Sequence, residues 1–173
     1  MYYISGPARR SAWKDRKCII DIANSTRITQ LLLFHFFKKG EYSKKDFENE
    51  FLKVDAIAGS FFITNHELFK KIGYFDENTF LFYEEDILGK KAKQSGYDIY
   101  SLNRLSFKHY ESKTIGKIIN CFKKQDILFN SKIYFQKEYN KVNKSQLFIF
   151  KILKYIRKFE VIFELLIQKL INS

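Results

Sequence analysis

Apolar and polar residues alternate in blocks that predict short regular elements in the middle of the chain. An apolar run over residues 54–58 stops at Gly59-Ser60, which is typical of a buried strand that approaches a tight turn. Asn65 is a suitable N-cap for a helix, and Gly73 suits the position just beyond a helix C-terminus. The pattern therefore predicts a strand over 54–58 and a helix over 66–72.

A second helix is predicted from the acidic triplet Glu84-Glu85-Asp86 to the residue before Gly96. Carboxylates at its start and lysines in its C-terminal half both suit the helix dipole. Residues 97–102 alternate as a strand does, and residues 105–109 continue as a further strand.

The two ends of the chain look different from this middle part. Apolar residues over 31–37 indicate a helix that ends near Gly40, and a polar loop follows. Beyond Thr114 apolar residues recur at helical spacing, and residues 145–171 are strongly apolar with a basic stripe, formed by Lys151, Lys154 and Lys158.

These elements predict an α/β chain in three segments. They are a basic and apolar lead-in over 1–50, a core over 51–114 and a helical tail over 115–173.

The net charge narrows the range of partners. Among 173 residues, 31 are Lys or Arg and 19 are Asp or Glu, which gives +12. Such a surplus favours nucleic acid, acidic lipid headgroups, or nucleotide and lipid pyrophosphates.

The first residues lack the pattern of a signal peptide, and no apolar run approaches the roughly 20 residues that span a bilayer. We therefore expect a cytoplasmic protein, with peripheral attachment at the inner face of the cell membrane left open.

The two cysteines, Cys18 and Cys121, are far apart in sequence. Two thiols so far apart make a weak case for a disulfide, and they cannot form a zinc site, which needs about four closely spaced ligands. We therefore expect both thiols to be reduced and buried.

The acidic triplet is the first candidate for chemistry. A helix N-terminus keeps a carboxylate ionised and in place, and such a group beside a cleft can act as a general base on a hydroxyl. The same triplet serves equally well to stabilise a first helical turn without any chemistry. His109 similarly fits either a ligand to a divalent ion or a structural role.

Five blocks in a fixed order add a family resemblance. They are Ala58-Gly59-Ser60-Phe61-Phe62-Ile63, Ile72-Gly73-Tyr74-Phe75-Asp76-Glu77, Phe80-Leu81-Phe82-Tyr83-Glu84-Glu85-Asp86-Ile87-Leu88, Gly96-Tyr97-Asp98-Ile99 and His109. This series resembles the family-two glycosyltransferases of the GT-A fold, most of all the rhamnosyltransferase-like enzymes of bacterial surface-polysaccharide assembly. The resemblance covers about residues 54–114, and residues 130–139 are similar to the family's helical tail. It implies a partial GT-A domain, Rossmann-like, with a C-terminal helical extension.

The resemblance also implies roles for particular residues. Gly59 and Ser60 would line the cleft between acceptor and donor, with Asp76 and Glu77 as substrate contacts. His109 would contact the metal or the diphosphate. The expected cofactor is a divalent cation, Mg or Mn.

The family's Glu-Asp pair, which supplies the catalytic base, can be aligned with this sequence in two registers. Without a gap, Glu84 falls on the family's Glu and Glu85 on its Asp, whereas a slip of one residue makes Glu85-Asp86 the pair. We expect Glu85 to be the base and Asp86 the second choice. The implied reaction is inverting transfer from a nucleotide-sugar to a saccharide or lipid-linked acceptor.

The donor side of the family's site has no counterpart in this sequence. The family's nucleotide-binding half and its Asp-x-Asp motif do not precede residue 54. We expect little transferase activity from the chain alone. The alternatives are a fragment, one piece of a split enzyme whose partner is a separate nucleotide-binding half, or a non-catalytic remnant.

The basic character has two further interpretations. Residues 145–171 either pack on the domain or lie at a membrane interface. Arg9, Arg10, Trp13, Arg16 and Lys17 suggest nucleic-acid binding, but the basic residues are spread along the chain and no nucleic-acid-binding signature occurs. We therefore expect no nucleic-acid partner.

Overall fold

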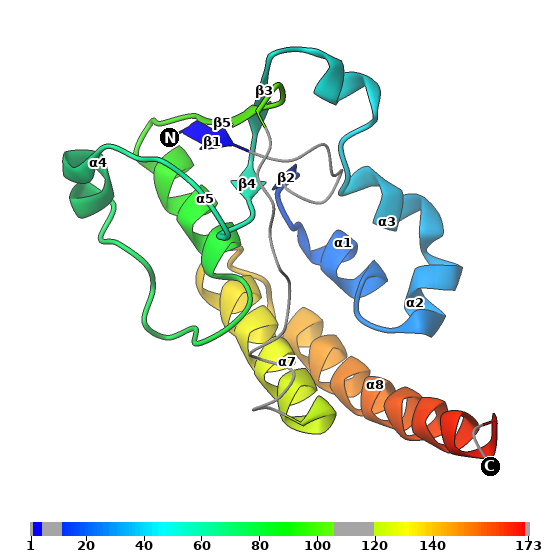
Figure 1. Ribbon diagram of the computed structural model, residues 1–173. Helices are drawn as coiled ribbons and strands as arrows, with labels where there is room; N and C mark the ends of the chain where they lie inside the picture. Colours follow the sequence, from blue (N-terminus) through cyan, green and yellow to red (C-terminus); the bar gives the residue numbers. More distant parts are fainter. Residues whose placement is uncertain (1, 5–11, 106–119, 172–173) are drawn as a thin grey trace. The chain divides into compact units, whose positions relative to one another are not determined.

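A computed structural model describes residues 2–4, 12–105 and 120–171 of the chain (Figure 1). The chain divides into two compact units, of which the first contains residues 1–16 and 39–111 and the second residues 17–38 and 112–173. The expected lead-in over 1–50 thus contributes to both units. The fold is a mixture of α-helices and short β-strands, so the predicted α/β class is confirmed at this level.

The first unit contains two small sheets. In the larger one, β5 (Ile99–Leu102) lies between β1 (Tyr2–Ile4), which is parallel to it, and β3 (Phe51–Val54), which is antiparallel. The smaller sheet pairs β2 (Ala12–Trp13) with β4 (Ala56–Ile57) in antiparallel register.

The predicted single strand over 54–58 is wrong, because Asp55 divides it. The N–H of Asp55 donates to the Tyr42 hydroxyl oxygen at 3.2 Å, and its carboxylate accepts from the N–H of Asp15 at 3.1 Å. The same carboxylate pairs with Lys93 at 3.1 Å. Because of these contacts, the strand pairing is interrupted at Asp55. Residues before it form β3, which pairs with β5, and residues after it form β4, which pairs with β2.

Both predicted helices of the first unit are present. Helix α4 (His66–Lys71) begins at Asn65, whose side chain accepts from the N–H of Leu68, and α5 spans Glu84–Gln94. Gly73 and Gly96 follow the two helices at φ +75° and +80°, a conformation that glycine adopts without steric cost. Leu105 lies outside any strand, and the rest of the strand predicted over 105–109 lies outside the described residues.

Helix α5 packs on β4 at close range, and Gly89 makes this approach possible. A Cβ at Gly89 would lie 2.1 Å from the carbonyl oxygen of Asp55. Around this contact the core of the unit gathers apolar side chains from several strands and from α5, namely Ala12, Val54, Ile57, Ala92 and Ile99. The short 3-10 helix η1 (Lys45–Glu48) adds Phe47 at the edge of this core.

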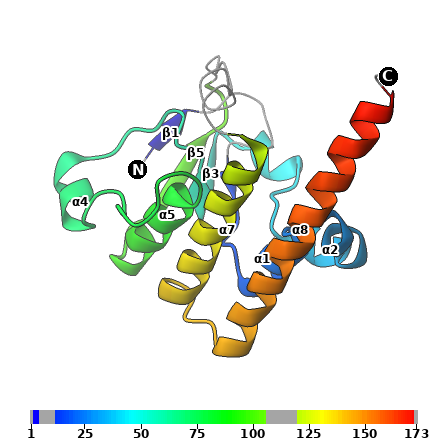
Figure 2. The same cartoon turned by 90° about the horizontal axis from the view of Figure 1, so that it is seen from below.

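The second unit is helical. It contains α1 (Cys18–Ala23), α2 (Arg27–Leu32), most of α3 (Phe34–Lys39), α7 (Cys121–Glu138) and α8 (Lys144–Ile171). Figures 1 and 2 show α7 and α8 side by side as an antiparallel pair joined by a short loop. The helix predicted over 31–37 is in fact split between α2 and α3, because Leu33 leaves the helical conformation with φ −113° and ψ 27°.

The interior of this second unit combines aromatic rings with a buried polar cluster. Phe129, Phe135 and Phe150 are fully buried. Beside them, the Nζ of buried Lys132 donates to the Ser25 hydroxyl at 2.9 Å and to the main-chain oxygen of Asp21 at 3.3 Å. Partners of this kind offset the cost of removing an ammonium group from water.

The cysteines are free, as expected, but they are not buried. Cys18 is half-buried and Cys121 is exposed, because each is the first residue of its helix. No helix in the described part of the chain combines the length and the apolar character that crossing a bilayer demands.

Candidate carboxylate site at the start of helix α5

The acidic triplet follows two residues with unusual backbone conformation. Phe82 and Tyr83 have φ values of +70° and +69°, and Tyr83 is the N-cap of α5 without a side-chain capping bond. A left-handed conformation costs a non-glycine residue about 1 kcal/mol. The chain therefore turns sharply at this point, and the three carboxylates leave it in different directions.

Glu85 is fixed against the glycine turn. Its Oε1 accepts a hydrogen bond from the N–H of Gly59 at 2.9 Å. A Cβ at Gly59 would also lie 2.9 Å from this oxygen, so a larger residue there would push the carboxylate away. The absence of a side chain at Gly59 thus allows a close approach, and the group that approaches is the Glu85 carboxylate.

Glu84 is partly buried beside Glu85. Its Oε2 is buried and accepts no hydrogen bond from the described residues. Burial, and next to it the negative charge of Glu85, raise the pKa of the Glu84 carboxyl above its ordinary value. A carboxyl group with a raised pKa beside a second carboxylate is a combination that is often found at functional sites.

Both glutamates line an open pocket of about 350 Å³. Its other lining residues are Gly59, Phe75, Thr79 and Phe80. The two phenylalanine rings are 40% and 82% exposed, although large apolar side chains gain free energy from burial. The pocket therefore combines two carboxyl groups with two accessible aromatic faces.

Asp86 points elsewhere and has structural partners. Its carboxylate accepts from the Trp13 Nε1–H at 2.6 Å and pairs with Arg16 Nε at 3.0 Å, and only 5% of the residue is exposed. The Arg16 guanidinium also lies over the rings of Trp13 and Tyr83, 5.2 and 5.0 Å from their centroids. Asp86 thus links the start of α5 to β2 and the residues that follow it.

The remaining candidate residues are spread around this site. Asp76 forms a turn, because its carboxylate accepts from the N–H and the side-chain amide of Asn78 at 2.9 and 2.8 Å. Ser60 and Glu77 are exposed and do not line the pocket. His109 lies outside the described residues, so its predicted role remains a prediction.

The described residues do not form a metal site by themselves. No three His, Cys, Asp or Glu side chains within residues 2–4, 12–105 and 120–171 gather closely enough to hold a metal ion. The divalent cation therefore remains a prediction from the resemblance.

Sequence reasoning missed the partners of the acidic helix. Trp13 and Arg16 looked like part of a nucleic-acid-binding cluster, but both contact Asp86. Lys90 similarly pairs with Asp15 at 2.6 Å. The signal that could have located these pairs is the excess of basic and aromatic residues at 13–17, opposite in charge to the triplet.

Comparisons with protein-family models, with curated proteins and with solved structures found no match to the chain.

Proposed function

We propose that the first unit carries the acceptor side of a glycosyltransferase site of GT-A type, with Glu85 as the general base. The observation that supports this most is the open pocket in which Glu85, held by the Gly59 N–H, lies beside Glu84 and two exposed phenylalanine rings. Three of the sequence blocks that resemble family-two glycosyltransferases contribute to this pocket, the first through Gly59, the second through Phe75 and the third through Phe80, Glu84 and Glu85.

Glu85 has the properties that a base for a hydroxyl group requires. The hydrogen bond from the N–H of Gly59 fixes its carboxylate at the start of α5. The hydrogen bond uses Oε1, so Oε2 remains available to accept a proton from an acceptor hydroxyl. As that proton moves to Glu85, the hydroxyl oxygen attacks the anomeric carbon, and the bond from that carbon to the nucleotide diphosphate breaks.

Asp86 is the weaker candidate for this role. Its charge is already balanced by Arg16, and its burial denies a substrate access. We therefore assign the base to Glu85 and give Asp86 the task of holding α5 in place.

Phe75 and Phe80 suit a saccharide. The C–H groups on one face of a sugar ring carry partial positive charge, and the face of an aromatic ring is negative. A sugar stacked on these rings would bring its hydroxyl groups toward Glu84 and Glu85. The carboxyl group of Glu84 lines the same pocket and can accept a hydrogen bond from such a hydroxyl.

Saccharide binding tests the proposal directly. We expect neutral mono- and disaccharides to bind the whole chain with millimolar affinity in saturation-transfer NMR. Phe80→Ala should weaken this binding several-fold because it removes the most exposed ring of the pocket. Phe51→Ala is the matched control, since Phe51 is 52% exposed on β3 and does not line the pocket. Failure of a broad saccharide panel to bind would refute the proposal.

Transfer activity is a second test. The sequence holds no Asp-x-Asp motif, so we expect little or no turnover of nucleotide-sugars by the chain alone. Measurable turnover would contradict that expectation. In such a case Glu85→Gln should lower kcat by at least about 100-fold, whereas Glu67→Gln on α4 should leave it unchanged.

A further inference from the structure

The net charge of the protein lies almost entirely in the helical unit. Residues 17–38 and 112–173 contain 16 Lys or Arg and 5 Asp or Glu, a net charge of +11. The first unit contains 15 basic and 14 acidic residues, a net charge of +1. Any long-range attraction toward an anionic partner therefore comes from the second unit.

Helix α8 in this unit exposes a continuous apolar stripe. Phe148, Tyr155, Phe159 and Phe163 are 62%, 64%, 73% and 66% exposed. Together with Ile152 and Leu166 they recur every three or four residues, so they lie on one side of the helix. This stripe, which we call the α8 stripe, extends over about 27 Å at the usual rise per residue.

The opposite side of α8 is packed inside the unit. Phe150, Leu153 and Val161 are buried, and α8 lies against α7 and α1. A helix that is apolar on both sides is normally covered on both sides. Among the described residues, none covers the α8 stripe as α7 and α1 cover the opposite side.

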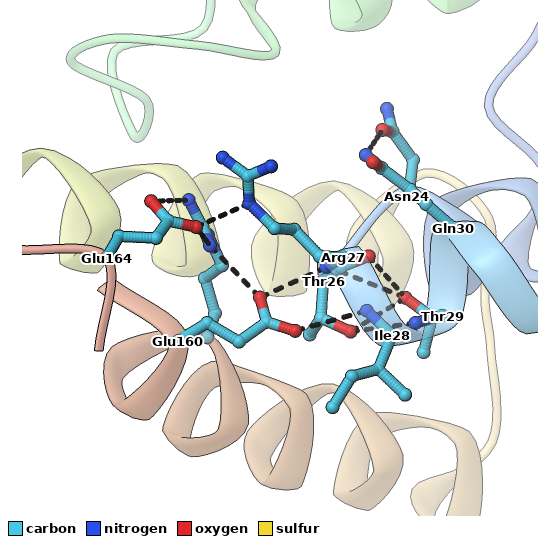
Figure 3. Close-up of polar contacts among 9 residues, drawn as sticks. Asn24, Thr26, Arg27, Ile28, Thr29, Gln30, Glu160 and Glu164 are labelled. Carbon is cyan, nitrogen blue, oxygen red and sulfur yellow. Dashed lines mark hydrogen bonds and ion pairs between the residues drawn. The ribbon is translucent and has the colours of Figure 1, made fainter. Parts of the chain in front are cut away.

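A polar network holds α8 in this orientation, as Figure 3 shows. The Glu160 carboxylate accepts from the N–H groups of Arg27 and Ile28 at 3.0 and 3.1 Å, at the start of α2. The Arg27 side chain pairs with Glu164 one turn farther along α8. These bonds oppose a rotation of α8 that would bury the stripe within its own unit.

Lysines accompany the stripe along one flank. Lys151 lies three residues after Phe148 and four before Tyr155, and Lys169 lies three after Leu166. Both lysines are exposed, as is Lys144 at the start of the helix. Exposed aromatic and aliphatic residues flanked by lysines are the pattern of a helix that lies in the headgroup region of a membrane.

We propose that the second unit binds the surface of an anionic phospholipid bilayer through the α8 stripe. The bilayer covers the apolar side chains while its negative headgroups face Lys144, Lys151 and Lys169. A second copy of the unit fits less well, because it would bring another +11 charge to the same place. This inference concerns the second unit alone and does not depend on the proposed transferase function.

Vesicle co-sedimentation of the whole chain tests this proposal. We expect binding to phosphatidylcholine vesicles that contain phosphatidylglycerol, weaker binding as salt rises, and little binding to phosphatidylcholine alone. The double substitution Phe159→Ser with Phe163→Ser should weaken binding by about tenfold or more, because two exposed rings no longer enter the bilayer. Lys151→Glu with Lys169→Glu should weaken binding to the anionic vesicles only. Phe51→Ser in the first unit is the matched control and should bind as the original chain does.

Three results would overturn the proposal. The first is no binding to the anionic vesicles by a chain whose circular dichroism shows intact helices. The second is equal binding by the double phenylalanine variant. The third is that the chain does not bind vesicles but instead forms a dimer or binds a single-stranded RNA, and that the same substitutions abolish this association.

Discussion

Asp86 illustrates how a carboxylate can be adjacent to a site in sequence and still serve the fold. It accepts from Trp13 and pairs with Arg16, and it is almost completely buried. A buried charge that loses its partner is expensive, so the effect of a substitution here should appear in stability before it appears in ligand binding.

Asp86→Asn should lower the free energy of unfolding by about 2 kcal/mol, since Arg16 would lose its counter-charge. The chain contains a single tryptophan, Trp13, so its fluorescence reports on this contact directly. Denaturant unfolding followed by Trp13 emission measures the change. Asp98→Asn, at an exposed pair with Lys53, is the control and should change little. Equal stability of Asp86→Asn and the original chain would show that the Arg16 pair contributes nothing.

Glu84 should show the opposite behaviour. Its pKa is raised in the folded state by burial and by Glu85, so the folded state binds more protons than the unfolded state between the two pKa values. Stability must then fall as pH rises through that window. Glu84→Gln should therefore raise the free energy of unfolding at pH 7 by about 0.5 kcal/mol, and the gain should vanish below about pH 4. Urea unfolding at both pH values measures it, and a loss of stability at pH 7 would contradict the raised pKa.

The sequence indicated the three carboxyl groups of the candidate site, but it did not indicate which of them line the pocket and which one forms an ion pair within the fold. The sequence favoured Glu85 as the base and Asp86 as the second choice, whereas in the structure Glu84 and Glu85 line the pocket and Asp86 does not. That division depends on Gly59 and Arg16, which lie 26 and 70 residues away from their partners in the chain. Contacts of this range follow from tertiary packing, which no local pattern encodes.

At the scale of elements, the packing of α5 on β4 depends on one missing side chain. Gly89 occupies the interior of α5, where alanine would favour the helix by about 1 kcal/mol. The close carbonyl of Asp55 reverses this preference, because a Cβ would lie 2.1 Å from it.

Gly89→Ala should therefore destabilise the first unit by about 2 kcal/mol or more, since the helix must move away from β4. Thermal unfolding followed by Trp13 fluorescence checks this. Gln94→Ala, at the exposed end of the same helix, is the matched control and should be nearly neutral. A stabilised Gly89→Ala variant would mean that helix propensity exceeds the cost of the clash.

The contact between α2 and α8 depends on Glu160. In the wild type the two carboxylate oxygens of Glu160 accept hydrogen bonds from the N–H groups of Arg27 and Ile28 and from the Arg157 side chain. Glu160→Gln leaves a single carbonyl oxygen to accept these bonds. We expect a loss of about 1 kcal/mol in the free energy of unfolding, measured by far-UV circular dichroism. Glu138→Gln on α7, whose carboxylate pairs with Lys137, is the control and should have little effect. A neutral Glu160→Gln would show that the helices are held by apolar packing alone.

Helices were easier to predict than strands for a physical reason. The start of α4 at Asn65 and the ends marked by Gly73 and Gly96 depend on residues inside or next to each helix. The division between β3 and β4 depends on Asp55, whose partners are Tyr42, Asp15 and Lys93. A strand therefore takes its limits from neighbours that are distant in sequence.

For the whole molecule, the net charge is unevenly divided between the two units. The sequence showed +12 and suggested several anionic partners, but the unit with the candidate carboxylate site carries only +1. The charge therefore does not by itself draw a nucleotide diphosphate to the Glu85 pocket. It belongs to the unit that also exposes the α8 stripe.

The same unit controls how the protein behaves in concentrated solution. Like charges keep its molecules apart, while the exposed rings of α8 attract one another at short range. Added salt removes the long-range repulsion and leaves the short-range attraction. The second virial coefficient measured by light scattering should therefore fall as sodium chloride rises, and more steeply than for Phe159→Ser with Phe163→Ser. Colloidal stability in this protein thus depends on the lysines that surround an apolar helix, and a low-salt buffer should keep it in solution.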